Sequence, residues 1–491
     1  MRAWVDLQAE CRPRDEAVSW RGASVDWRDL RERVAVLARR LDSALGDRPR
    51  IVAVLAAPSL RLLELLHAAQ VAGVTLAPLP ARGTDEDWRR VLSSTAPSLV
   101  LHGSAYADSV ARLSREDGWR ALDLEADLDR EPPSGRSFDP VAPGRAWLLV
   151  HTSGTTGVPK GVVLTNEQLA AAATAVIARL GCRPGERWLA AMPMHHVGGL
   201  SVPVRAAVGG LSVVLHEGFD AAAVRRSLDT ESIAWVSLVP TMLASLLDLA
   251  PATTAPRALR GAILGGGRLP PRLVERAAAL GWPLVATYGM TETAAQVTTS
   301  HPGDAASHPG SAGHPLPGNE LRIDSPGPDG VGEIVVRGAQ VAGRDGAEAA
   351  LEAAERRERW LHTGDLGRVD ADGRLWVETR RTDLIVTGGE NVHPEEVEDV
   401  LLLHPSVVDA GVFAVDDERW GQVVGAAVVA GPGAPSDGDL QAWCRARLAG
   451  FKVPRRWLRL DRLPRNAAGK LERLRLRERV HSTSEASAGS R

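Results

Sequence analysis

Residues 147–164 read WLLVHTSGTTGVPKGVVL, and this stretch decides how the rest of the chain is organised. Its two ends, residues 147–150 and 161–164, are short apolar runs typical of buried strands. The loop between them is rich in glycine, serine and threonine and ends in Lys160. Glycines let backbone N–H groups point into one cavity, hydroxyls add donors, and the lysine adds a positive charge. Such a loop after a strand predicts a site for the phosphates of a nucleotide.

The loop has two alternative interpretations. A glycine- and threonine-rich loop by itself is more often a flexible surface turn, but the full string TSGTTGxPKG is far more specific. It is not the Walker A motif of P-loop ATPases, which requires Gly-Lys-Ser/Thr, because Pro159 precedes the lysine here and Gly161 follows it. A P-loop ATPase would release ADP and phosphate, so identifying the released products would distinguish this alternative.

The composition narrows the class of protein. At 491 residues the chain is too long for one compact core, which predicts two or more domains. A formal net charge of −3 gives no general attraction to nucleic acid or to anionic lipid. Three cysteines without paired spacing, Cys11, Cys182 and Cys444, argue against a disulfide framework and against a zinc site. The N-terminus lacks the apolar core of a signal peptide, so we expect a cytoplasmic protein without stable membrane association.

Short apolar runs alternate with helical patterns over the first part of the chain. Residues 51–56 and 74–79 are strand-like, and residues 59–72 between them have helical spacing. Apolar strands between helices indicate a parallel sheet that is covered on both faces. Thr165, with Gln168 three residues later, predicts a capping box at the start of an alanine-rich helix.

The same alternation returns later, and then the pattern changes. Residues 284–287 are strand-like, which places Tyr288 just past a strand end, where ligand sites of such sheets lie. From about residue 302 to 379, glycine and proline turns separate short strands and predict an appended β subdomain. A smaller unit with a helix starting at Pro394 follows, and residues 481–491 are predicted to be disordered.

Two further motifs offer groups that suit a nucleotide. In ATYGMTE, residues 286–292, the ring of Tyr288 can stack on a purine, and Glu292 is a hard oxygen ligand for Mg²⁺. In WLHTGD, residues 360–365, Asp365 can accept hydrogen bonds from ribose hydroxyls. Each of these motifs alone is also typical of an ordinary turn.

Three more segments carry candidate residues. RRTDLIVTGGENVHPEEVE, residues 380–398, stands at the change of composition and is a candidate hinge between domains. LPRNAAGKL, residues 463–471, places Lys470 on a glycine turn, although such a lysine is normally just solvated. His195 and His196 in PMHHVGG suggest no third metal ligand nearby, so a core or pocket-lining role is favoured over a metal site.

In this order and spacing the motifs resemble the adenylate-forming superfamily, which includes acyl- and aryl-CoA ligases, stand-alone adenylation domains and luciferases. The resemblance runs over nearly the whole chain. Segments such as PMHHVGGL, LGGGRLP and GSAGHPLP are most similar to those of the o-succinylbenzoate–CoA ligases of menaquinone biosynthesis. The resemblance implies a reaction in two steps. A carboxylate first attacks the α-phosphate of ATP, and the thiol of CoA then displaces AMP. ATP, Mg²⁺, CoA and a carboxylic acid are therefore the expected cofactor and partners.

The resemblance also implies the fold. We expect an α/β protein whose large N-terminal domain, residues 1–379, is built of doubly wound mixed or parallel sheets, with the β subdomain at about 302–379. A hinge at residues 380–382 would join it to a small mobile α+β domain at residues 383–480. Thr382 would be the hinge residue. No nucleic acid is expected as a partner, and a homodimer is left open.

Each residue that matches a motif receives a role from the resemblance. Lys470 would bridge the acyl carboxylate and the α-phosphate during adenylation only, and Glu292 would hold Mg²⁺ together with Thr156. The catalytic residues would be Lys470, Glu292, Thr156 and His196. The phosphates would be bound by Thr152, Ser153, Gly154, Thr155, Thr156, Gly157, Lys160 and Lys470.

The remaining roles concern the nucleoside, the acyl group and the thiol. Tyr288 would lie against adenine, and Asp365 with Arg380 would fix the ribose. His196 would line the acyl pocket and gate the thiol channel. Further contacts to ATP would come from Gly266, Gly289 and Thr291. The acyl and CoA pocket would comprise His196, Gly198, Gly265, Thr287, Gly388 and Gly389.

The sequence departs from the family pattern at a few positions. Residues 341–359 lack the usual Gly-Tyr pattern, His151 stands where an aromatic residue is common, and Thr382 stands where many relatives have an acid. A substrate with a second carboxylate requires a cation, for which Arg205 and Arg268 are candidates. The alternatives are another aryl- or fatty-acyl-CoA ligase, an adenylation enzyme that loads a carrier protein, and a non-catalytic nucleotide-binding paralogue.

Overall fold

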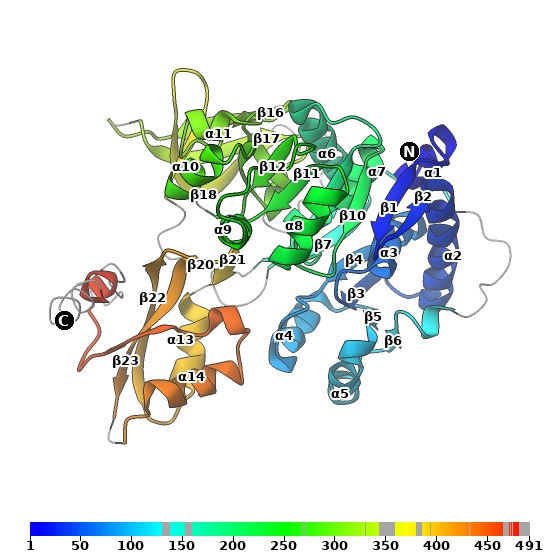
Figure 1. Ribbon diagram of the computed structural model, residues 1–491. Coiled ribbons are helices and arrows are strands. Elements are labelled where there is room, and N and C mark those ends of the chain that lie inside the picture. The colour runs from blue at the N-terminus through cyan, green and yellow to red at the C-terminus, as the bar shows by residue number, and fades with distance from the viewer. Residues whose placement is uncertain are drawn as a thin grey trace. The chain divides into compact units, whose positions relative to one another are not determined.

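The chain divides into two compact units, which the computed structural model in Figure 1 presents. Unit 1 comprises Met1–Ala81, Val91–Thr152 and Gly161–Thr379, and unit 2 comprises Arg82–Arg90, Ser153–Lys160 and Arg380–Arg491. The structure describes residues 1–129, 138–152, 160–267, 269, 271–328, 330–342, 359–379, 385–392, 394–431, 433–464, 471, 473 and 475–480.

A six-stranded sheet in unit 1 contains the two strands that flank the predicted phosphate loop. In sheet order the strands are β6 (Ala121–Asp123), β5 (Leu99–His102), β3 (Ile51–Leu55), β4 (Thr75–Pro78), β7 (Ala146–Thr152) and β8 (Lys160–Thr165). The strands from β6 to β7 pair in parallel, because each apolar run is followed by a helix that returns the chain to the same edge.

The helix that follows β8 begins and ends where the sequence predicts. The capping box is confirmed: Gln168 N donates to Thr165 Oγ1 at 3.3 Å, and Thr165 N donates to Gln168 Oε1 at 2.9 Å. The helix then ends at Gly181, which has a φ of 63° that favours glycine. The helices of this part are α1 (Trp4–Cys11), α2 (Trp27–Leu45), α3 (Leu60–Ala72), α4 (Asp85–Thr95), η1 (Ser104–Tyr106), α5 (Ala107–Asp117), η2 (Asp127–Asp129) and α6 (Asn166–Leu180).

A nine-stranded mixed sheet is the second large element of unit 1. Its order is β15 (His314–Pro315), β14 (Ala295–Thr299), β13 (Leu284–Met290), β12 (Gly261–Leu264), β11 (Ile233–Leu238), β9 (Arg187–Ala190), β10 (Ser212–Leu215), β1 (Glu16–Trp20) and β2 (Ala23–Asp26). The helices that accompany it are α7 (Val197–Gly209), α8 (Ala221–Thr230), α9 (Pro240–Leu249), α10 (Pro271–Ala279), η3 (Thr291–Thr293) and α11 (Asp304–Ser307).

Two apolar cores lie on either side of this sheet. One core contains Trp188 and Val213 from the sheet together with Val176 of α6. The other contains Leu284 of β13 and Leu246 of α9. Helices therefore cover both faces of the sheet, which confirms the predicted doubly wound α/β class.

One local prediction was wrong. Tyr288 does not lie past the strand end but inside β13, which continues to Met290. The reason is the antiparallel partner β14: Tyr288 pairs with Thr298, and Gly289 pairs with Gln296. The ladder with β14 thus extends the strand beyond its apolar run, which the sequence alone did not show.

The last part of unit 1 is a four-stranded antiparallel sheet. It consists of β16 (Asn319–Asp324), β17 (Gly332–Gly338), β18 (Leu361–Val369) and β19 (Leu375–Thr379) in this order. Strand β18 alternates buried and half-buried or exposed residues from Leu361 to Gly367, as expected for a sheet with one face in a core. Its buried face packs in a cluster that also contains Tyr288 and Val297.

Unit 2 is a smaller α+β structure. Its sheet has the order β21 (Glu390–Val392), β20 (Ile385–Thr387), β23 (Gly421–Ala430) and β22 (Val407–Asp417), and β24 (Arg456–Arg459) pairs with β23 in parallel. Helices α13 (Pro394–Leu402) and α14 (Asp437–Arg445) pack on it, and η5 (Gly450–Lys452) follows. Buried Leu401, Val412, Ala426 and Leu440 form the core of the unit.

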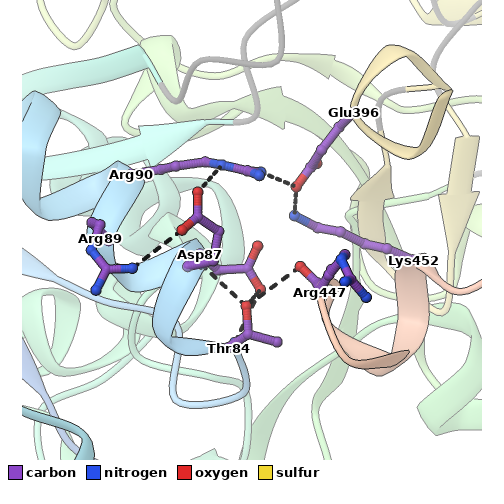
Figure 2. Close-up of polar contacts among 8 residues, drawn as sticks. Thr84, Asp87, Arg89, Arg90, Glu396, Arg447 and Lys452 are labelled. Atoms are coloured by element: carbon purple, nitrogen blue, oxygen red, sulfur yellow. Dashed lines mark hydrogen bonds and ion pairs between the residues drawn. The ribbon is translucent and has the colours of Figure 1, made fainter. Parts of the chain in front are cut away.

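Residues 82–90 cluster with unit 2 through polar contacts (Figure 2). Lys452 Nζ donates to Glu396 Oε1 at 2.6 Å, and Arg90 Nη1 lies 3.8 Å from the same oxygen. The Thr84 hydroxyl donates to the main-chain oxygen of Arg447 at 3.4 Å. Because the Lys452 and Glu396 side chains are only 15% and 9% exposed, their attraction is less screened than that of a surface pair.

Candidate active site

The phosphate loop begins at the carboxyl end of β7. His151 is the last residue but one of this strand, and its Nε2 lies 2.9 Å from the hydroxyl of Thr95. Burial lowers the pKa of His151 to about 4, so the ring is neutral at neutral pH. Thr152 ends β7 and Lys160 begins β8. The other predicted phosphate ligands lie outside the described residues: Ser153, Gly154, Thr155, Thr156 and Gly157.

Tyr288 and Asp365, which are far apart in the sequence, meet in unit 1. The Tyr288 hydroxyl donates to Asp365 Oδ2 at 2.7 Å, and the two residues are 5% and 9% exposed. Thr363, two residues earlier in β18, fixes the backbone before Asp365, because its hydroxyl accepts from Asp365 N at 3.1 Å and donates to Ile334 O at 2.7 Å. The aspartate is therefore held in one orientation, with Oδ1 free of any hydrogen bond to a described residue.

Glu292 lies on a tight turn after β13. Short helix η3 carries it, and the buried hydroxyl of Thr293 bonds to Met290 and to Ala295 within the turn. Within the described part of the chain the Glu292 carboxylate forms no ion pair, and it is partly exposed. A carboxylate of this kind fits Mg²⁺, which prefers hard oxygen ligands and keeps several waters. Thr156, the other expected ligand, lies outside the described residues.

Two predicted site glycines are required by close approach. A Cβ at Gly289 would lie 1.7 Å from the main-chain oxygen of Ala295, so only glycine fits beside the turn. A Cβ at Gly265 would lie 2.7 Å from Thr287 Oγ1, which donates to Leu264 O at 2.9 Å. The contact between Gly265 and Thr287 thus brings the ends of β12 and β13 together. Gly266 and Thr291 lie just after these strand ends in the chain.

The two histidines stand at the start of α7. His196 is the residue before the helix, and the rings of His195 and His196 are 4.2 Å apart between centroids. Gly198 lies in the first turn of the same helix. The predicted acyl-pocket residues His196 and Gly198 thus share one helix start, while Gly388 and Gly389 form the turn between β20 and β21 in unit 2 with φ values of 60° and 85°.

Arg205 is a buried cation on α7. Its side chain is 3% exposed, and Nη2 donates to Gln296 Oε1 at 3.1 Å and to Ser201 Oγ at 3.4 Å. The guanidinium lies 4.4 Å from the ring centroid of Trp188. Its Nε and Nη1 have no hydrogen-bond partner among the described residues. Burial lowers the pKa of Arg205 to about 10, so the group stays charged at neutral pH.

The remaining predicted residues keep the status of predictions. Arg268, Arg380, Thr382 and Lys470 lie outside the described residues. Sequence reasoning missed Gln340, a fully buried amide beside the Glu292 turn, and Gln296, the partner of Arg205. A single glutamine in a segment without periodicity gives no signal in one sequence, so neither could be found that way.

Comparison with known proteins defines the class. The chain matches the AMP-binding enzyme family over residues 5–344 and the AMP-binding enzyme C-terminal domain over residues 396–470. It belongs to the AMP-binding enzyme family.

Individual relatives give a narrower comparison. The chain is 36% identical over 488 residues to a 2-succinylbenzoate–CoA ligase of Bacillus cereus, with 98% of each chain covered. It is similar to the structure of a double mutant of o-succinylbenzoate CoA synthetase from Bacillus subtilis bound with its product analogue OSB-NCoA, with a TM-score of 0.90, 33% identity and coverage of 97% and 98%. The same synthetase in complex with ATP and magnesium ion gives a TM-score of 0.72, 32% identity and coverage of 97% and 99%. Among the described residues, no helix is both long and apolar enough to cross a membrane.

Proposed function

We propose that this chain is an ATP-dependent acid:CoA ligase that acts on 2-succinylbenzoate in menaquinone biosynthesis. In the first step an oxygen of the acid attacks the α-phosphorus of ATP, the bond to the β-phosphate breaks, and pyrophosphate leaves. In the second step the sulfur of CoA attacks the acyl carbon and AMP leaves. The relatives named above, with their ATP, magnesium and CoA-analogue complexes, support both the reaction and its cofactors.

The observation that carries the choice of substrate is the buried Arg205. A guanidinium that is 3% exposed, with two nitrogen atoms that have no partner in the described part of the chain, is costly unless an anion completes its hydrogen bonds. Its helix α7 directly follows His196, and its partner Gln296 pairs with Gly289 of β13. A dicarboxylate such as 2-succinylbenzoate would place its second carboxylate on Arg205 while the first one reacts.

The residues of this chain would act mainly by holding and neutralising anions. Asp365, fixed by Tyr288, would hold the ribose hydroxyls, and Glu292 with Thr156 would hold Mg²⁺. The metal ion, when bound, withdraws charge from the phosphates. Lys470 would bring the carboxylate and the α-phosphate together against their mutual repulsion. The neutral His151 adds no charge beside the phosphate loop.

A selectivity measurement tests this function. The ratio of kcat/KM for 2-succinylbenzoate to that for benzoylpropionate, which lacks the ring carboxylate, isolates the second carboxylate. We expect the unmodified enzyme to prefer the dicarboxylate, and Arg205→Met to lose about 2–5 kcal/mol of that preference, which is roughly 30-fold or more. AMP release with and without CoA, or with a carrier protein, separates the ligase from an adenylation enzyme.

A matched control removes another guanidinium of unit 1. Arg179 donates to the main-chain oxygens of Thr299 at 3.1 Å and Pro315 at 2.7 Å, so Arg179→Met should lower stability without changing the preference between the two acids. An unchanged preference in Arg205→Met would refute the role of Arg205, and absence of a preference in the unmodified enzyme would refute the assignment of the substrate. Absence of AMP formation with any acid would favour a non-catalytic paralogue.

Three statements about the protein's location and partners belong to the same proposal. The cysteines Cys11, Cys182 and Cys444 are free, which suits the reducing cytoplasm. A homodimer remains a prediction, which light scattering of the purified protein would test. No nucleic acid takes part in the proposed reaction.

A further inference from the structure

The turn that carries Glu292 is followed by two strained residues. Ala294 has a φ of 50° and Ala295 a φ of 102°, both in the region that non-glycine residues rarely adopt. Two such residues in succession cost free energy and persist only where surrounding contacts hold them in place. The position of Glu292 therefore depends on whatever fixes the chain on both sides of this dipeptide.

Gln340 makes those contacts. Its Nε2 donates to the main-chain oxygen of Thr293 at 2.7 Å and also to the main-chain oxygen of Gln296. These two oxygens flank Ala294 and Ala295, so one amide group bridges the strained dipeptide. Gln340 is 1% exposed, so bulk water does not compete for these hydrogen bonds.

The amide is itself fixed in orientation. Its Oε1 accepts from Asn319 Nδ2 at 2.9 Å, which directs both N–H bonds toward the turn. Next to it, Ala342 N donates to the main-chain oxygen of Glu292 at 2.7 Å. The carbonyl of Val341 accepts from Gln168 Nε2 at 3.0 Å, so the segment is also anchored to the start of α6. The segment around Gln340 thus holds the backbone of Glu292 and of the residues after it.

We propose that Gln340 is a positioning residue for the metal ion, acting through the backbone of the turn that carries Glu292. The inference rests on the proposed function in one respect, namely that Glu292 binds the Mg²⁺ that accompanies ATP. Gln340 would act through its hydrogen bonds to the turn, without being a ligand of the metal ion. Its loss lets the dipeptide relax and moves the carboxylate away from the metal position.

The test measures binding, independently of catalysis. Gln340→Met keeps the length of the side chain but deletes both N–H donors. Calorimetric titration with α,β-methylene-ATP, with and without Mg²⁺, gives the Mg²⁺-dependent gain in nucleotide affinity. We expect the gain to fall by about 10- to 100-fold, the range for loss of an outer-shell partner of a metal ligand, with unchanged affinity in the absence of Mg²⁺.

A matched control separates positioning from general stability. Gln70 is also buried, at 2% exposed, and its Nε2 donates at 3.0 Å to Asn166 Oδ1, an acceptor that is not part of the turn. Gln70→Met should lower the melting temperature and leave the Mg²⁺-dependent gain unchanged. If Gln340→Met does not fold, Gln340→Asn, which keeps the amide on a shorter side chain, takes its place with the same expected direction.

A double mutant identifies the route. If Gln340 acts through Glu292, then Gln340→Met should change the Mg²⁺-dependent gain little once Glu292→Gln is present. An unchanged gain in Gln340→Met, or additive losses in the double mutant, would overturn the inference. Failure of the proposed function looks different: the unmodified protein would then show no Mg²⁺-dependent gain at all.

Discussion

Removal of one hydroxyl tests the contact between Tyr288 and Asp365. Tyr288→Phe keeps the ring and its packing but deletes the 2.7 Å hydrogen bond to Asp365 Oδ2. A hydrogen bond to a charged group contributes about 1.5–3 kcal/mol. Because Asp365 is 9% exposed, water compensates for little of this loss.

The loss should appear in two measurements. The free energy of unfolding should fall, because a buried carboxylate loses its donor. The KM for ATP should rise by roughly tenfold, which corresponds to about 1.5 kcal/mol, the lower end of that range. The lower end is expected because the variant keeps the ring surface that is predicted to face adenine. Urea denaturation and pyrophosphate release at varied ATP concentration measure these quantities.

The other tyrosine of the chain is the control. Tyr106 donates its hydroxyl to the main-chain oxygen of Ala81 at 3.2 Å, and the group is partly buried. Tyr106→Phe should lower stability slightly and leave the KM for ATP unchanged. If Tyr288→Phe lost stability but bound ATP as well as the unmodified protein, Asp365 would not hold the nucleotide and its proposed role would be wrong.

The remaining predictions concern the lysine proposed to act in adenylation, Lys470, and acid stability. Lys470→Ala should slow adenylation by roughly 10²–10³-fold while the second step, started from synthetic acyl-adenylate, largely survives; equal losses in both steps would argue against its role in adenylation alone. Burial lowers the pKa of His67 to about 4, so the unfolded chain takes up a proton below about pH 6.5 that the folded chain does not. Stability from this group is complete above that pH and is lost as the pH falls toward 4. His67→Leu should therefore reduce the difference in unfolding free energy between pH 7 and pH 5 by about 2 kcal/mol, and an unreduced difference would show that the ring is not buried neutral.

Local sequence rules predicted the framework because each rule depends on neighbouring residues. The capping box of Thr165 and Gln168 and the helix start at Pro394 are fixed within one helical turn, and the structure has both. The alternation of strands and helices gave the α/β class for the same reason. The length of β13 was mistaken, because its antiparallel partner β14 comes later in the chain.

The same distinction between local and long-range contacts applies to the candidate site. Motifs identified Tyr288 and Asp365 separately, but their contact joins two different sheets and needs the fold. The burial of Arg205 and the bridge made by Gln340 also depend on contacts with distant strands, and neither residue belongs to a motif. Polar side chains become informative only when the structure shows which of their partners are missing or present.

Isotope transfer tests the central claim most directly. The acid is prepared with ¹⁸O in both carboxylates and incubated with ATP, Mg²⁺ and CoA, and the released nucleotide is analysed by mass spectrometry. Attack of the carboxylate on the α-phosphorus predicts one ¹⁸O atom in each AMP formed. Unlabelled AMP, or label in inorganic phosphate alongside ADP, would contradict adenylate formation by this chain.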